Sequence, residues 1–215
     1  MVRTVSDKIV LAKLAARVAK TDPMLANIYD RLGPPPLWGR PANLQTLVHI
    51  ILEQQVSLAS GRAALKKLKS ACDGRINAKR LIELGQSGMR DQARLTRQKS
   101  SYIYALAEAV SNRDLVLKQL ESQTDEQVRD QLTSIKGIGR WTSDVYLVMA
   151  LKRADVLPLG DLALELEFAK LLKRKQRPTD QQLLRRAKRW QPYRAVAARM
   201  LWHSYLDRLG RHDEI

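Results

Sequence analysis

The sequence predicts an all-α protein built from about ten or more short helices. No segment alternates apolar and polar residues over a useful strand length, whereas apolar residues recur at helical spacing through most of the chain. Asp, Asn, Ser or Thr stands directly before many of these segments, where such residues cap helices. At 215 residues and 45% hydrophobic composition the chain can bury a real core, as one domain or as two lobes sharing a cleft, and no internal repeat is evident.

The first helices are marked by their caps and by their apolar spacing. Residues 6–20 predict an amphipathic helix, and Asp22 followed by Pro23 starts a second helix that ends at Leu32. The Gly- and Pro-rich segment 33–41 predicts an extended connector. Residues 43–54 are apolar on nearly all sides, which is typical of a helix at the centre of a domain.

The middle and the end of the chain predict further helices. Ser57 caps one of them, and Thr124 with Gln127 forms a capping box for another, which leads into a glycine-rich turn. The expected helices are 58–70, 77–84 before a turn at 85–88, 98–110, 114–120, the helix after Thr124, one beginning at 139 or 140, one from 162 through 172, a Thr179-capped helix to 189, and a final helix from 193.

The charge balance favours a polyanionic partner. Lys and Arg number 38 against 22 Asp and Glu, a net charge of +16. Nucleic acid is the usual partner of such a chain because neutralising phosphates releases counterions. A generally basic soluble protein is the alternative. The most basic stretch, residues 173–189, could contact phosphate or could serve only to keep the surface soluble.

Cysteine and histidine usage argues against a metal centre held by side chains. The single cysteine, Cys72, excludes an intramolecular disulfide and a cysteine cluster for zinc or for iron and sulfur. The three histidines are too scattered to suggest a metal site. The sequence has neither a run of about 18 apolar residues nor an apolar N-terminal core of the secretory kind. We therefore expect an intracellular protein with no membrane partner.

A turn with two glycines stands in the sequence LTSIKGIGRWT. Gly137 and Gly139 flank Ile138, and this spacing predicts a tight turn in which both glycines supply backbone angles that other residues resist, while Ile138 inserts into the core. A helix is expected to begin at Gly139 or Arg140, so that its first N–H groups lie beside Lys136 as a phosphate-binding site. The alternative is an ordinary connection between two helices.

Five other residues could carry chemistry. Gln54 and Gln55 follow the central buried helix and could reach bases or backbone of a nucleic acid, or could be polar loop residues. Trp141 and Trp202 would ordinarily pack in the core, although Trp202 lies beside the apolar stripe of its helix and could line a cleft. Asp161 directly precedes an apolar helix, where it would act as the N-cap. A carboxylate held at a helix start is also stabilised in its charged form.

Together these residues resemble a known family. The glycine turn, followed by Leu157-Pro158 and Asp161, resembles the helix-hairpin-helix plus Gly/Pro-Asp signature of base-excision DNA glycosylases. Within that superfamily the chain is most similar to the alkylation-repair branch, 3-methyladenine DNA glycosylase II. The match extends to residues 51–57 and 189–202. It implies the DNA-glycosylase fold, with a middle lobe at 43–153, a second lobe formed by 1–42 and 154–215, and a cleft between them.

The resemblance implies excision of alkylated purines from double-stranded DNA. Such enzymes flip the damaged nucleotide out of the duplex and break its bond to deoxyribose. A 3- or 7-alkylated purine already carries positive charge and leaves readily. Asp161 would stabilise the oxocarbenium-like sugar and position water. Trp202 would stack on the cationic base, and Trp141 would line the same pocket.

The resemblance also assigns residues that contact DNA. Gln55 stands where some relatives carry an aliphatic wedge and would fill the gap left by the flipped nucleotide. Glu53 stands where a small Gly is common. Lys136, ahead of the first hairpin glycine, should face phosphate. The full set of implied DNA contacts is Gln54, Gln55, Lys136, Gly137, Ile138, Gly139, Arg140 and Thr142.

Position 141 predicts the type of reaction. Branches of the family with lyase activity carry a Lys nucleophile there, which forms a Schiff base with the sugar. This chain has Trp141, which predicts a monofunctional glycosylase that needs no cofactor. The alternatives are a glycosylase and lyase using another Lys, and a non-catalytic helix-hairpin-helix protein that binds DNA by shape and phosphate contact alone.

Three further expectations complete the prediction. The chain resembles the compact version of the family, because nothing in residues 1–40 could build the β domain of the bacterial long form. We expect a monomer that acts on the nucleoid. In family terms, main-chain carbonyls near Thr133, Ile135 and Gly137 could also hold a monovalent cation that bridges to phosphate.

Overall fold

The structure is a computed structural model that describes residues 3–211, and it divides into two compact units. Unit 1 contains residues 1–39 and 152–215, and unit 2 contains residues 40–151. The chain therefore crosses between the units twice, at 39/40 and 151/152, where the expected lobe boundaries were 42/43 and 153/154.

The architecture is helical, as predicted. Residues 3–211 form eleven α-helices and two short 3-10 helices, and the β pairing among them is limited to an isolated bridge between Thr4 and Arg153. Within this part of the chain, no helix is long and apolar enough to cross a membrane.

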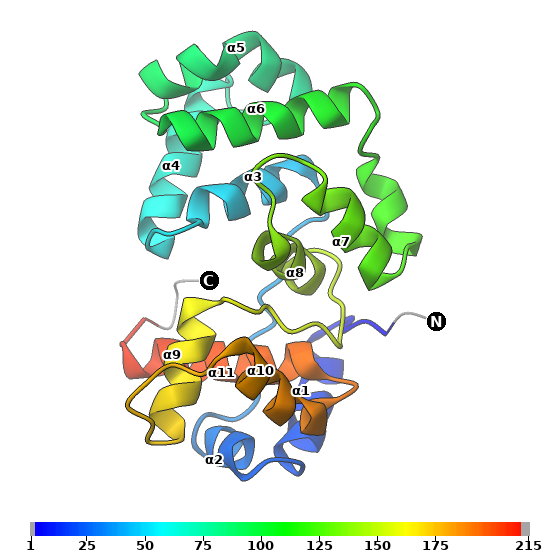
Figure 1. The fold of residues 1–215 in the computed structure, drawn as a ribbon, viewed down its shortest axis with the longest axis vertical. Helices are drawn as coiled ribbons and strands as arrows, with labels where there is room; N and C mark the ends of the chain where they lie inside the picture. The colour runs from blue at the N-terminus through cyan, green and yellow to red at the C-terminus, as the bar shows by residue number, and fades with distance from the viewer. Residues whose placement is uncertain (1–2, 212–215) are drawn as a thin grey trace. The chain divides into compact units, whose positions relative to one another are not determined.

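Unit 1 is organised around its last helix, α11 (Arg194–Arg208), which packs against three other helices of the unit (Figure 1). Every residue from Ala195 to Trp202 is buried, because this stretch of α11 is surrounded by its neighbours. At the start of α2 the predicted cap is confirmed, since the side chain of Asp22 accepts a hydrogen bond from the Met24 N–H. The other helices of unit 1 are α1 (Lys8–Ala19), α2 (Pro23–Leu32), α9 (Leu162–Leu171), α10 (Asp180–Ala187) and the 3-10 helix η2 (Lys188–Trp190).

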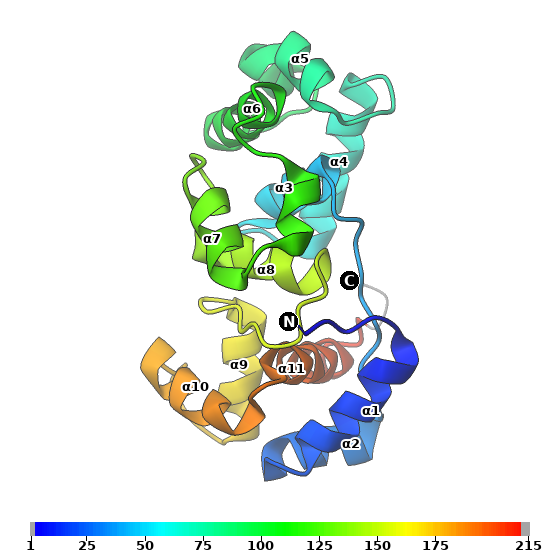
Figure 2. The ribbon, with the colours of Figure 1, turned by 90° about the vertical axis from the view of Figure 1, so that its right-hand side faces the viewer.

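Unit 2 has α3 (Leu44–Glu53) at its centre, in contact with α4, α6 and α8. Eight of the ten residues of α3 are buried, which confirms the central helix predicted from its apolar composition. The neighbouring pair α5 and α6 lies side by side in both views (Figures 1 and 2). The other elements of unit 2 are α4 (Leu58–Ala71), α5 (Ala78–Asp91), α6 (Arg97–Ser111), the 3-10 helix η1 (Leu117–Ser122), α7 (Asp125–Thr133) and α8 (Arg140–Met149).

Three of the predicted elements are wrong in detail. The helix expected at 77–84 continues to Asp91, because Gly85 absorbs the break with φ 65° and ψ 171° and Met89 is buried beyond it. The helix expected at 114–120 is instead the 3-10 helix η1. The helix expected to reach residue 189 ends at Ala187 and tightens into η2, which buries Trp190.

Candidate functional site

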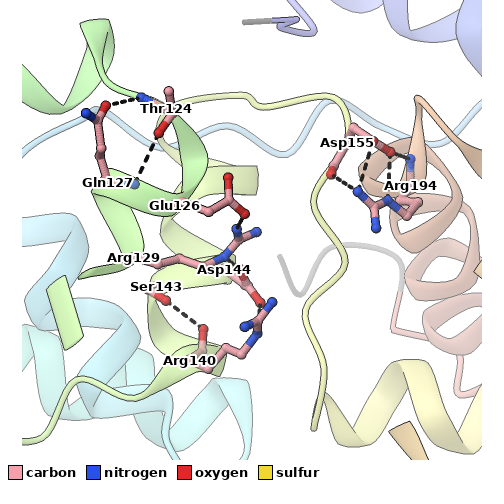
Figure 3. A network of polar contacts seen from close by, with 9 residues as sticks. All are labelled: Thr124, Glu126, Gln127, Arg129, Arg140, Ser143, Asp144, Asp155 and Arg194. Atoms are coloured by element: carbon pink, nitrogen blue, oxygen red, sulfur yellow. Dashed lines mark hydrogen bonds and ion pairs between the residues drawn. The ribbon is translucent and has the colours of Figure 1, made fainter. Parts of the chain in front are cut away.

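The glycine turn joins α7 to α8 in unit 2. Thr124 and Gln127 form the predicted capping box at the start of α7 (Figure 3). In the turn, the Ile138 N–H donates to the Ile135 carbonyl at 3.1 Å, and the Ile138 side chain is 3% exposed, as expected for a core anchor. The helix α8 then starts at Arg140, after an N-cap residue, Gly139, that provides no side-chain hydrogen bond.

The two glycines of this turn have different roles, which corrects the expectation that both supply unusual backbone angles. Gly137 has φ +89°, in the left-handed region that favours glycine. A Cβ at Gly137 would also lie 2.0 Å from Cγ of Tyr102, so the aromatic ring of α6 packs directly on the glycine backbone. Gly139 has φ −93°, an ordinary value, and a Cβ there would meet no atom within 4 Å.

Gln54 connects the end of α3 to the hairpin. Its Nε2 donates to the Gly137 carbonyl and to the Thr142 hydroxyl, both at 2.9 Å. Thr142 is 1% exposed, so its side chain serves this contact inside unit 2. The amide of Gln54 therefore braces the hairpin, a function that its place in the sequence did not predict.

The end of α3 is held by further polar contacts. The Lys99 ammonium donates to the Leu52 carbonyl at 2.6 Å, and burial lowers the pKa of Lys99. The Arg40 guanidinium binds both carboxylate oxygens of Glu53 at 2.8 Å. The next exposed residue, Gln55, has φ 58°, an uncommon left-handed conformation for a residue other than glycine. These contacts fix the backbone from which Gln55 extends.

A cavity of about 530 Å³ lies beside the hairpin within unit 2. Gln98, Lys99 and Tyr102 of α6 contribute to its wall, and Gln98 donates a hydrogen bond to the Tyr102 hydroxyl at 2.7 Å. The sequence analysis did not identify these three residues. Their spacing along α6 placed Gln98 and Tyr102 on one helix face, but no local pattern indicated that this face meets the hairpin. Gln54, Gln55 and residues 133–139 form the rest of the lining.

The main-chain carbonyls proposed for a monovalent cation belong to this cavity wall. The Ile135 carbonyl accepts the Ile138 N–H, and the Gly137 carbonyl accepts the Gln54 amide. Each carbonyl oxygen has two lone pairs, so these hydrogen bonds are compatible with a further ligand, and the cation stays a prediction. Within residues 3–211 there is no group of three or more His, Cys, Asp or Glu side chains suited to a metal ion.

A buried carboxylate orients arginines at the start of α8. Asp144 accepts a hydrogen bond from Arg129 Nε at 2.6 Å, and Arg140 Nε lies 3.6 Å from its other oxygen (Figure 3). Burial raises the pKa of Asp144, against the opposing effect of Arg129. Arg129 also binds Glu126, whereas the Arg140 side chain is 63% exposed beside the hairpin. Asp144 was not predicted as a site residue.

Asp161 and Trp202 meet in unit 1. Asp161 caps α9 as predicted, since its Oδ1 accepts the Leu164 N–H at 2.9 Å. The same oxygen accepts the indole N–H of Trp202 at 3.0 Å. Asp161 is 8% exposed and Trp202 is 4% exposed. Gly160, with φ +76°, makes the turn that brings the carboxylate to the helix start.

A second carboxylate lies one helical turn beyond Asp161. Glu165 is 8% exposed, and its Oε2 lies 3.2 Å from Arg177. Burial raises the pKa of Glu165, and the nearby charge of Asp161 adds to the effect, against the opposing charge of Arg177. The sequence analysis did not identify Glu165, although its position four residues after Asp161 places the two on the same helix face.

Comparison with known proteins decides the family. Residues 48–192 match the model described as HhH-GPD superfamily base excision DNA repair protein. The chain belongs to this superfamily. The matched range includes the glycine turn and Asp161, the two features on which the predicted resemblance depended, and so confirms the predicted family.

Relatives of this HhH-GPD chain lie in both yeast and bacteria. It is 26% identical to the alkylbase DNA glycosidase-like protein mag2 of Schizosaccharomyces pombe, with 86% of this chain and 89% of the relative covered. A crystal structure of DNA-3-methyladenine glycosidase from Bacillus halodurans is 27% identical with a TM-score of 0.76, covering 95% of this chain and 92% of that one. The Schizosaccharomyces pombe 3-methyladenine DNA glycosylase in complex with abasic DNA has a TM-score of 0.82 at 24% identity, covering 89% and 96%, and supports the fold.

The predicted site residues of the HhH-GPD chain form two groups. Asp161 and Trp202 are joined by a hydrogen bond in unit 1. Gln54, Gln55 and the hairpin are joined in unit 2, where the half-buried Trp141 stands in the first turn of α8. Lys136, Gly139 and Arg140 are exposed, whereas the side chains of Ile138 and Thr142 are buried and available only through their backbone.

Proposed function

We propose that this chain excises alkylated purines such as 3-methyladenine and 7-methylguanine from double-stranded DNA, by hydrolysing the N-glycosidic bond of a flipped nucleotide. The observation that carries the proposal is the pairing of Asp161 with Trp202, in which an indole N–H holds a nearly buried carboxylate at 3.0 Å. The names of the relatives support the same substrate class.

Asp161 would act on the sugar. An alkylated purine carries positive charge and leaves with little help, so the main requirement is an anion beside the developing oxocarbenium ion and a group that orients water. Two N–H groups converge on Asp161 Oδ1 and fix the orientation of the carboxylate before substrate arrives. Such preorganisation lowers the barrier because no dipole must reorient during the reaction.

Trp202 would act on the base. Its N–H is used by Asp161, which holds the indole ring beside the carboxylate. A cationic purine is attracted to the electron-rich face of tryptophan, whereas a neutral purine gains only stacking. We assign Trp141 to the base pocket as well, on the family resemblance.

The hairpin would hold the DNA backbone. The start of α8 has no side-chain cap, and the exposed side chains of Lys136 and Arg140 flank its N–H groups, an arrangement suited to phosphate. Gln55 would fill the gap left by the flipped nucleotide, and the braced end of α3 would keep it in place. We expect a monomer that acts on nucleoid DNA without a cofactor.

The decisive experiment is base release by Asp161→Asn. Asn caps helices as well as Asp does and can accept both hydrogen bonds through its side-chain carbonyl, so folding should be preserved. Release of 3-methyladenine and 7-methylguanine from alkylated duplex should fall by about 100-fold or more, as for other lost electrostatic groups in active sites. Asp180→Asn, at an exposed position of α10, is the matched control for the change in charge.

The outcomes separate the possible roles of Asp161. Undiminished base release by Asp161→Asn would refute the proposed mechanism. For the monofunctional assignment, borohydride should trap no covalent adduct between the protein and damaged DNA, because Trp141 cannot form a Schiff base. A trapped adduct would instead indicate a lysine nucleophile elsewhere in the chain.

A further inference from the structure

The segment from the end of α9 through η2 carries a large share of the charge of the protein. Residues 173–189 contain eight Lys or Arg and a single Asp, a net charge of +7 out of +16 for the whole chain. This segment comprises the loop after α9 and the helix α10, which can be followed in Figures 1 and 2. The proposed activity assigns no role to it.

Three of these cations have partners within unit 1. Arg186 forms an ion pair with the buried Asp22, and Arg177 lies 3.2 Å from Glu165. Arg174 donates to the Gln182 side chain at 3.1 Å. The remaining five are exposed, and none of them forms an ion pair with any residue in the described range 3–211: Lys173, Lys175, Arg185, Lys188 and Arg189. We call these five the basic face.

The basic face is mounted on a firm support. Arg185, Lys188 and Arg189 are spaced by three and four residues, so they lie on one side of α10 and its continuation η2. The opposite side of this element buries Leu183, Ala187 and Trp190. A second list describes how the element is tied down: the Thr179 capping box, the Arg186 pair with Asp22, and the Arg174 contact that joins the loop to the first turn of α10.

We propose that the basic face is a second contact surface for the phosphate backbone of duplex DNA, separate from the hairpin. Like charges this close repel one another, and a polyanion removes that repulsion while releasing its own counterions. Keeping a protein soluble does not require the charges to be concentrated on one element, nor does it require that element to be fixed by a capping box and a buried ion pair. The inference rests on the proposed function only in taking DNA as the partner.

Salt dependence of binding tests the proposal directly. The variant Arg185→Gln/Lys188→Gln/Arg189→Gln removes three charges from the basic face. The matched control Lys8→Gln/Lys13→Gln/Lys20→Gln removes three exposed charges from α1 and its end in the same unit. Affinity for an undamaged duplex is measured from low to physiological salt. Each lost phosphate contact reduces the slope of log K against log salt by about 0.9, so three contacts predict a reduction of about 2.7.

The control decides whether the effect is local. If the basic face binds DNA, its variant loses slope and about tenfold or more in affinity at low salt, whereas the α1 control keeps the wild-type slope. Equal slopes for the two variants, or an unchanged slope in the basic-face variant, overturn the proposal. Binding to vesicles of phosphatidylserine that depends on these residues while the DNA slope does not would likewise overturn it.

Two measurements keep the outcome readable. Thermal unfolding of both variants should match the wild type, because the substituted side chains are exposed. Base release at saturating protein should also be unchanged, since the chemistry is assigned to Asp161. If the wild type released no alkylated base, the proposed function would fail while the salt-slope comparison would still test the basic face.

Discussion

Alanine at Gly137 and alanine at Gly139 should have different consequences, although the two glycines stand two residues apart in one turn. At Gly137 the backbone is left-handed, with φ +89°, and an added Cβ would lie 2.0 Å from Cγ of Tyr102. At Gly139 φ is −93°, and the added Cβ would meet nothing within 4 Å. The pair therefore compares one substitution with and without a steric cause.

The size of the difference follows from two contributions at Gly137. A non-glycine residue in the left-handed region costs about 1–2 kcal/mol. Forcing an extra methyl into a filled site costs about 1–3 kcal/mol. Gly137→Ala should therefore lower the free energy of unfolding by about 2–5 kcal/mol, a large part of the stability of a typical domain. Gly139→Ala changes only the N-cap residue and should cost about 1 kcal/mol or less.

Denaturant unfolding measures both variants, together with Tyr102→Ala and the double variant Gly137→Ala/Tyr102→Ala. Removing the ring should recover the steric part of the cost, about 1–3 kcal/mol, as a coupling energy, and leave the backbone strain. Duplex affinity of Gly137→Ala should fall in parallel, because the hairpin loses its shape. Equal destabilisation by the two alanines, or an additive double variant, would refute the assignment of the steric role to Gly137 and Tyr102.

Three further substitutions probe the rest of the structure. Gln54→Met keeps the length of the side chain but removes both hydrogen bonds to the hairpin, so the free energy of unfolding should fall by about 1–3 kcal/mol in a denaturant titration; an unchanged midpoint contradicts this. Gly61→Ala would place a Cβ 2.7 Å from Cγ of Glu53, and the expected loss of about 1–3 kcal/mol should shrink when Glu53→Ala is added. Burial would raise the pKa of Asp22, but hydrogen bonds from Arg186 and a buried indole outweigh it and lower the pKa. Stability from Asp22 is therefore present above about pH 4 and is lost as pH falls through the lower folded pKa. Arg186→Met should flatten that acid loss in thermal unfolding, and a curve parallel to the wild type would argue against it.

Local features of the fold could be predicted well because their causes are local. Asp22, Thr124 and Asp161 cap helices through side chains that contact N–H groups two or three residues away. Such contacts depend on neighbouring sequence alone, and all three were predicted. The errors lie where a single residue admits two outcomes. Gly85 was expected to end a helix, but the burial of Met89 on the far side carries the helix onward.

The supports of the site could not be predicted because they join distant segments. Gln54 and Gly137 are separated by 83 residues, and the link between them is a hydrogen bond that no local pattern encodes. Tyr102 packs on Gly137 from a different helix, with an ordinary helical context of its own. The chemistry-bearing residues were found through a motif, whereas the residues that hold them in place required the three-dimensional contacts.

The two roles of Asp161 can be separated because they depend on different properties of one side chain. Capping α9 and accepting the Trp202 N–H both use Oδ1 as a hydrogen-bond acceptor, and an asparagine carbonyl supplies the same acceptor. Only the negative charge is special to aspartate. A chain that needed Asp161 for its fold alone would therefore lose nothing in Asp161→Asn. Loss of base release in a variant that unfolds at the wild-type temperature would isolate the charge as the contribution to catalysis.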